Sequence, residues 1–174
     1  MSRYFPHAAF AEDQPLPKTI LTTHVLLRGL TSGTLISGVV TSARQIIPRW
    51  RPAVNPGATF LPRLVAGAAT GSVWGIGLSG VALVARMWGR EAIEWEDRSW
   101  RLMENKGQLE TDDWTYGAMG LAAVGWAARG MPMGWKGALG AMGWGSVGGM
   151  FGYMAWRHGV NGGRFPNGEK EKVL

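Results

Sequence analysis

Small residues recur every four positions within the apolar stretches of this chain, and this spacing constrains its fold more than any other feature. Glycine or serine occupies positions 67, 71, 75 and 79 in one stretch, and positions 29, 33 and 37 in another. A third stretch has glycine or alanine at positions 137, 141, 145 and 149. Residues four apart lie on the same face of an α-helix. Each stretch therefore predicts a helix with one smooth face of small residues.

Helices of this kind suit a bilayer better than water. Glycine in the interior of a water-exposed helix costs about 1 kcal/mol relative to alanine. In a membrane, helices associate by close packing, and small residues let two backbones approach. We therefore predict an all-α membrane protein with four Gly-rich transmembrane helices. The predicted helix-packing residues are Gly29, Gly33, Gly67, Gly71, Gly75, Gly137, Gly145 and Gly149.

The distribution of charge agrees with this fold class. The chain has 174 residues, a net charge of +6 and no cysteine, which excludes disulfides and thiol chemistry. Leu64 to Ala85 carries no charge across 22 residues, and Gly137 to Trp156 carries none across 20. About 20 apolar residues are enough to cross a bilayer. Because the arginines gather at the ends of the apolar stretches, we expect a membrane protein without a nucleic-acid partner.

The apolar stretches predict the organisation of the chain. We expect a polar arm (1–17), a four-helix transmembrane domain (18–157) and a polar tail (158–174). The four expected spans are Thr19–Ile47, Phe60–Trp88, Trp114–Ala128 and Trp135–Arg157, with a charged connection over residues 89–113. The third span is the shortest, and a tight turn over 130–133 is expected to join it to the fourth as a hairpin.

Basic residues in the loops predict the orientation in the membrane. The first loop carries Arg49 and Arg51, is flanked by Arg44 and Arg63, and contains no acidic residue. The third loop is also basic. The positive-inside rule places both loops on the cytoplasm-like side, which for a mitochondrial inner membrane is the matrix. Four spans then return both termini to the opposite side, in that case the intermembrane space. The four arginines are predicted to hold the headgroup of an anionic lipid such as cardiolipin.

The first 18 residues do not have the pattern of a cleaved targeting segment. They contain two acidic residues and three prolines, and they lack the apolar region of a signal peptide. We expect a mitochondrial protein with this sequence to carry an internal targeting signal.

No motif in the chain predicts catalysis. Gly75 to Gly80 matches the dinucleotide pattern GxGxxG, but it lies inside a long apolar stretch rather than between a strand and a helix. We interpret it as part of a packing face. The three histidines, His7, His24 and His158, do not have the spacing of metal ligands. We therefore expect no catalytic residue, no metal and no cofactor other than bound phospholipid.

Arg28 is the one ionisable residue whose position along its helix is compatible with the membrane interior. Arg44 follows 16 residues later, about 24 Å along a helix. The two guanidinium groups can therefore extend to opposite interfaces, and we expect Arg28 to do so. The alternative is a buried, functional arginine. Its acidic partner would then belong to a neighbouring protein, because none of the four expected spans contains Asp or Glu.

The connection over residues 89–113 interleaves aromatic and charged side chains. Its four basic and eight acidic residues give it a net charge of −4. This pattern is typical of an amphipathic helix at the membrane interface. Tryptophan and arginine also anchor protein interfaces, and the two interpretations are compatible. The predicted partner-docking residues are Trp95, Arg98, Trp100 and Arg101.

Four short Gly-rich spans without cysteine resemble the mitochondrial inner-membrane translocase channel superfamily, which includes an accessory membrane subunit of respiratory complex I. The segment from Trp95 to Trp114, WEDRSWRLMENKGQLETDDW, is similar to small fungal mitochondrial membrane proteins. Accessory subunits of NADH:ubiquinone oxidoreductase are among them. The resemblance implies a structural subunit without a redox centre.

We therefore expect a non-catalytic accessory subunit of complex I that supports its membrane arm by helix packing and lipid contacts. Its partners would be other membrane-arm subunits. Trp74, Trp126 and Trp144 would pack against these subunits or against lipid. The alternative is a subunit of an inner-membrane protein translocase or a solute-conducting channel, which needs a polar groove within the spans.

Overall fold

The computed structural model describes residues 4–50, 59–130 and 134–165, and all regular structure in these ranges is helical. The α-helices are α1 (Pro17–Ile46), α2 (Phe60–Met87), α3 (Ala92–Glu104), α4 (Lys106–Ala128) and α5 (Gly134–Met154). Short 3₁₀ turns cover Ala11–Asp13 and Pro48–Trp50, and a π-helical turn, Ala155–Val160, continues α5. The prediction of an all-α protein is confirmed.

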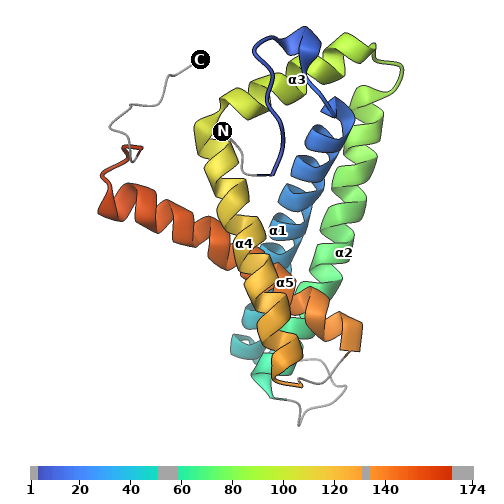
Figure 1. The fold of residues 1–174 in the computed structure, drawn as a ribbon. Coiled ribbons are helices and arrows are strands. Elements are labelled where there is room, and N and C mark those ends of the chain that lie inside the picture. Colours follow the sequence, from blue (N-terminus) through green and yellow to red (C-terminus); the bar gives the residue numbers. More distant parts are fainter. Residues whose placement is uncertain (1–3, 51–58, 131–133, 166–174) are drawn as a thin grey trace.

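The four long helices form two pairs (Figure 1). Helices α1 and α2 lie side by side over most of their length, and α4 packs on α5. Helix α5 crosses the bundle obliquely and joins the pairs by contacting both α2 and α1. Helix α3 lies across one end of the bundle, and the residues before α1 fold against it. We call this end of the molecule the α3 end. The opposite end, where Arg44, Arg49 and Arg63 lie, is the basic end.

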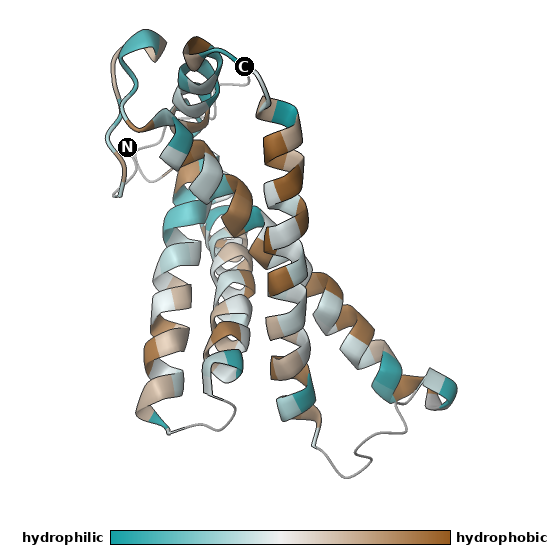
Figure 2. Ribbon diagram, turned by 90° about the vertical axis from the view of Figure 1, so that its right-hand side faces the viewer, coloured by the Kyte–Doolittle hydropathy of each residue, from teal (hydrophilic) through white to brown (hydrophobic). Residues whose placement is uncertain are grey.

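Two of the helices, α1 and α2, are long and apolar enough to cross a membrane. In Figure 2 the most hydrophilic segments gather at the α3 end and at the ends of the long helices. Large apolar side chains project outward from all four long helices. Examples are Ile36 and Val39 on α1, Trp74 and Val81 on α2, Leu121 and Val124 on α4, and Phe151 on α5.

Glycine sets the distance between α1 and α2. A Cβ atom added at Gly33 would overlap the carbonyl oxygen of Gly71, and one added at Gly75 would overlap that of Gly29. Beside this contact, the buried hydroxyls of Thr34 and Ser72 are hydrogen-bonded at 2.8 Å. The two backbones are therefore in direct contact, with no room for a larger side chain.

The charged connection over residues 89–113 is mostly helical, in agreement with the amphipathic helix that its pattern indicates. It contains α3 and the first two turns of α4, which begins eight residues before the predicted Trp114. Asn105 separates the two helices, because its side-chain oxygen accepts a hydrogen bond from the Gln108 amide at 3.0 Å and caps α4. With 23 residues, α4 is longer than the 15-residue span expected from the uncharged stretch.

The N-terminal arm is folded onto the helices rather than free. Trp100 of α3 donates its indole N–H to the Ala8 carbonyl at 3.2 Å and stacks on His7. Tyr4 meets Tyr116 of α4 edge to face, and Phe5 packs against a buried cluster of Ile20, Met103 and Leu109. This cluster ties the arm, α1, α3 and α4 together at the α3 end.

Candidate functional site

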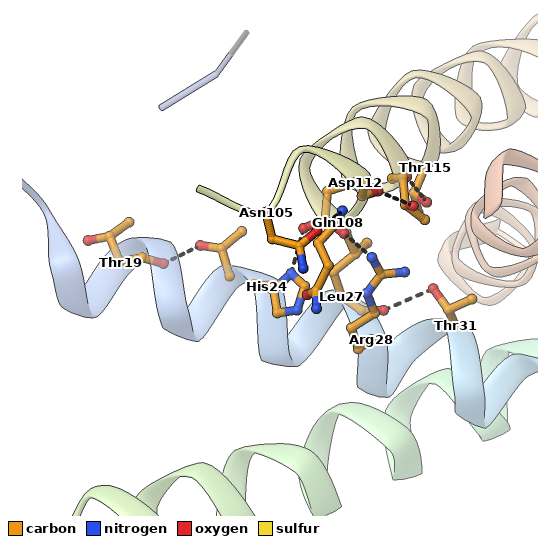
Figure 3. A network of polar contacts seen from close by, with 12 residues as sticks. Thr19, His24, Leu27, Arg28, Thr31, Asn105, Gln108, Asp112 and Thr115 are labelled. Atoms are coloured by element: carbon orange, nitrogen blue, oxygen red, sulfur yellow. Dashed lines mark hydrogen bonds and ion pairs between the residues drawn. The ribbon is translucent and has the colours of Figure 1, made fainter. Parts of the chain in front are cut away.

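A carboxylate of α4 meets two basic side chains of α1 inside the bundle (Figure 3). Asp112 Oδ1 lies 2.7 Å from Arg28 Nη2, and Asp112 Oδ2 lies 2.5 Å from His24 Nδ1. The Asp112 side chain is 9% exposed and that of Arg28 is 30% exposed. We call these three residues the charge cluster. The carboxylate is hydrogen-bonded to the imidazole and paired with the guanidinium, so it connects α4 to α1 by charge.

Local structure explains why these side chains converge. His24 and Arg28 are four residues apart, so they lie on one face of α1. The Asn105 cap starts α4 early enough to place Asp112 in its second turn, facing α1. Nearby hydroxyls bond to their own helices: Thr31 donates to the Leu27 carbonyl at 2.9 Å, and Thr115 to that of Thr111 at 2.6 Å. They do not compete for the carboxylate.

A second polar contact lies between α4 and the end of α5. Arg157 is only 5% exposed, donates to the Tyr153 hydroxyl at 3.1 Å, and lies over the ring of Phe165 at 4.3 Å. Tyr153 also contacts Trp114 of α4, and Glu110 of α4 faces the same tyrosine. Neighbouring carboxylates of α4 are thus directed to opposite sides, Asp112 toward α1 and Glu110 toward α5.

A groove of about 1190 Å³ runs along the outer face of the α1–α2 pair. Its floor is the glycine contact between the two helices, and side chains such as Ile36 and Trp74 form its walls. Arg44 and Arg63 line it toward the basic end, while Arg28 lines it toward the α3 end. Arg28 and Arg44 are about 24 Å apart along α1. The groove is therefore long, mostly apolar and bordered by cations.

The structure brings most of the predicted packing glycines into contacts between helices. Gly29, Gly33, Gly71 and Gly75 form the α1–α2 contact, and Gly67 lies against the Thr41 hydroxyl. On α5, a Cβ added at Gly145 would lie 2.7 Å from the Ala118 carbonyl oxygen, and one at Gly149 would lie 2.6 Å from that of Trp114. Gly137 is buried. The Gly75–Gly80 motif lies within α2, which leaves no strand-to-helix turn for a dinucleotide.

The predicted headgroup arginines are distributed around the basic end. Arg44 and Arg63 line the groove, and Arg49 is exposed in the short turn after α1. Arg51 lies outside the described residues. The groove therefore adds an apolar surface next to two of the arginines, which the sequence pattern alone did not indicate.

The predicted docking residues on α3 are engaged within the chain. Trp100 packs on the N-terminal arm, and the ring of Trp95 has the Lys18 ammonium 5.9 Å from its centroid. Arg98 and Arg101 pair within α3, Arg101 at 3.0 Å from Asp97. The outer face of α3 presents these ion pairs, while Trp100 holds the arm and Trp95 lies against Lys18 of α1.

Two sequence-based expectations are wrong. Arg28 does not extend alone to an interface: it pairs with Asp112 of the same chain, which was placed in the connection because α4 was predicted to start at Trp114. Trp144 does not point to a partner: its ring packs on Gly38 of α1, and its indole N–H donates to the Leu64 carbonyl at 3.4 Å. Trp74, in contrast, is exposed.

The cap of α4 was the missed signal. Asn105, three residues before Gln108, marks a helix start, and a helix beginning there carries Glu110, Asp112 and Asp113 into the bundle.

The fold and the charge cluster thus define an all-helical protein with two helices able to span a membrane. No protein-family model matches the chain, and no curated protein matches it.

Proposed function

We propose that this chain is a non-catalytic accessory subunit of mitochondrial respiratory complex I that stabilises the membrane arm by helix packing and lipid contacts. The observation that carries the proposal is the backbone contact of α1 with α2 at Gly29, Gly33, Gly71 and Gly75. A contact made by backbones has few alternative arrangements, so the bundle can act as a rigid wedge between neighbouring subunits. The resemblance of residues 95–114 to fungal mitochondrial membrane proteins supports the choice of complex.

The proposal includes four spans, with α4 and α5 crossing the membrane as a hairpin. Both helices carry outward apolar side chains, such as Leu121, Val124 and Phe151. Their hydropathy is lowered by glycine and tryptophan, and in α4 also by acidic residues. Two of those acids are directed to groups inside the bundle, Asp112 to Arg28 and Glu110 to Tyr153. Both termini and α3 then lie toward the intermembrane space, with the basic end in the matrix.

The groove on the α1–α2 face suits an anionic phospholipid such as cardiolipin. Arg44 and Arg63 would hold the headgroup at the basic end, where the exposed Arg49 adds positive charge. The glycine floor would hold an acyl chain. Other membrane-arm subunits would cover the remaining outward faces.

The same groove favours a second candidate, a subunit of a protein translocase or solute-conducting channel. It is open to the outside, and serine and threonine side chains line it. However, Ser37, Thr70 and Ser79 donate their hydroxyls to carbonyls of their own helices, so they offer little to a polar solute. The accessory-subunit proposal therefore has the stronger support.

Blue-native electrophoresis of digitonin-solubilised mitochondria, with mass spectrometry of every slice, tests the proposal. We expect the chain to migrate with NADH dehydrogenase subunits and their supercomplexes. Migration with the import machinery would select the translocase candidate. A small free oligomer would also discard the complex I assignment and would favour the translocase or solute-conducting candidate.

A further inference from the structure

The two helix pairs differ in how readily they enter a membrane. Among the described residues, α1 and α2 are long and apolar enough by themselves to cross a bilayer, whereas α4 and α5 are long enough but less apolar. Helix α4 begins with Lys106 and carries Glu110, Asp112 and Asp113 in its first half. An ionised carboxylate is among the least favourable side chains within a membrane span. Insertion of α4 therefore needs a compensating group.

Arg28 is placed to compensate Asp112. Its guanidinium lies 2.7 Å from one carboxylate oxygen, and His24 holds the other. The benefit is mutual, because Arg28 lies some 11 residues, or about 16 Å, from the start of α1 and would otherwise be a lone charge in that span. Each charged group thus lowers the free-energy cost of placing the other at this depth in the membrane.

The α4–α5 hairpin has the contacts of a unit that docks. Within it, Gly145 and Gly149 bring α5 against carbonyls of α4. Between the pairs, a Cβ added at Gly140 of α5 would overlap the Val65 carbonyl oxygen of α2, which shows how closely α5 seats. The charge cluster joins the other arm of the hairpin to α1.

We infer that the α1–α2 pair inserts first and that Arg28 then pairs with Asp112 as the α4–α5 hairpin inserts. This ion pair, which we call the latch, holds the hairpin in the membrane. The inference rests on the four-span arrangement proposed above. It assigns Arg28 a role in membrane insertion, separate from any contact with lipid or partner subunits.

Cysteine accessibility tests the latch, because the chain has no cysteine of its own. Two single-cysteine reporters, Thr59→Cys at the start of α2 and Ala128→Cys at the end of α4, occupy exposed positions at the basic end. The full chain would be expressed in a bacterial plasma membrane. Spheroplasts and inverted vesicles would be labelled with a membrane-impermeant maleimide, which reports the side on which each cysteine lies.

In the otherwise unchanged chain, both reporters are expected on the same side. Opposite sides would refute the four-span arrangement, and with it the proposed topology, whatever Arg28 does. With that established, Arg28→Leu should move the Ala128→Cys reporter to the other side and leave Thr59→Cys in place. The ratio of inserted to uninserted hairpin should fall on the order of 100-fold, the cost of one unpaired acidic residue in a span. Unchanged labelling would overturn the latch.

Two further variants keep the result specific. Arg28→Leu combined with Asp112→Leu should restore insertion, since no carboxylate at position 112 then needs a partner. Failure of this rescue would overturn the inference, because the loss would not come from the unpaired charge. Arg86→Leu is the matched control, an exposed arginine in the last turn of α2. It should leave the hairpin in place, and relocation by this variant would equally refute the specific role of Arg28.

Discussion

The two helix pairs are held together by different means. Helices α1 and α2 meet backbone to backbone over glycine, and the hydrogen bond between Thr34 and Ser72 lies inside that contact. Helices α4 and α5 also meet at glycines, but α4 depends in addition on polar side chains directed to its neighbours. The α1–α2 pair is stabilised by shape, whereas α4 is held in the bundle by shape together with charge. Changes of volume and changes of charge should therefore affect the two pairs differently.

The largest effect is expected where the backbones touch. Replacing Gly71 and Gly75 together by leucine would place side chains where the carbonyl groups of Gly33 and Gly29 lie. We expect the free energy of unfolding in detergent micelles to fall by about 3 kcal/mol or more. The amount of assembled complex should fall with it in mitochondria.

Gly77 of the same helix provides the control, because nothing lies within 4 Å of a Cβ added there. Gly77→Leu should leave stability and assembly near those of the natural chain. Normal assembly of the Gly71→Leu/Gly75→Leu variant would refute the packing argument for α1 and α2.

A smaller loss is expected from breaking the charge cluster in the folded protein. Arg28→Met keeps the length of the side chain but leaves Asp112 with His24 alone. Removing one partner of a buried ion pair costs about 3–5 kcal/mol. Because the Arg28 side chain is 30% exposed, we expect about 2 kcal/mol in detergent-based unfolding.

The double variant Arg28→Met/Asp112→Leu sharpens this result. Removing both charged groups should recover a large part of the lost stability, since no uncompensated carboxylate remains. If the losses from the two single changes simply add, the ion pair does not couple α1 to α4.

The sequence predicts the helical fold class and the bounds of α1 and α2, but it does not predict the start of α4. The reason for this difference is physical. The apolar stretches gave both ends of α2 and α1 to within two residues, because prolines and arginines end the uncharged runs. The start of α4 was missed because its acids look like part of a soluble connection. Their partners are distant in sequence: Arg28 precedes Asp112 by 84 positions, and no local pattern records such a pairing.

The α4–α5 contact should respond to volume less strongly than the α1–α2 contact. Gly149→Ala adds one methyl group close to the Trp114 carbonyl oxygen and the Thr115 backbone. We expect a loss of about 1 kcal/mol in the free energy of unfolding. Gly148→Ala, at the next position, has open space and should be neutral or slightly stabilising through helix propensity. Equal effects at both positions would contradict a close α4–α5 contact.

The smallest effect is expected at the α3 end, away from the glycine contacts of both pairs. Trp100→Phe keeps a ring to stack on His7 but loses the hydrogen bond to the Ala8 carbonyl, which is worth about 1 kcal/mol. The N-terminal arm should then open about fivefold more often, which limited proteolysis before Pro17 can measure. Trp88→Phe, at an exposed position after α2, is the control. Unfolding of the helices themselves should be unchanged, because the arm covers their ends without contributing to either glycine contact. A loss of stability in both helix pairs would instead show that the arm contributes to the stability of the bundle.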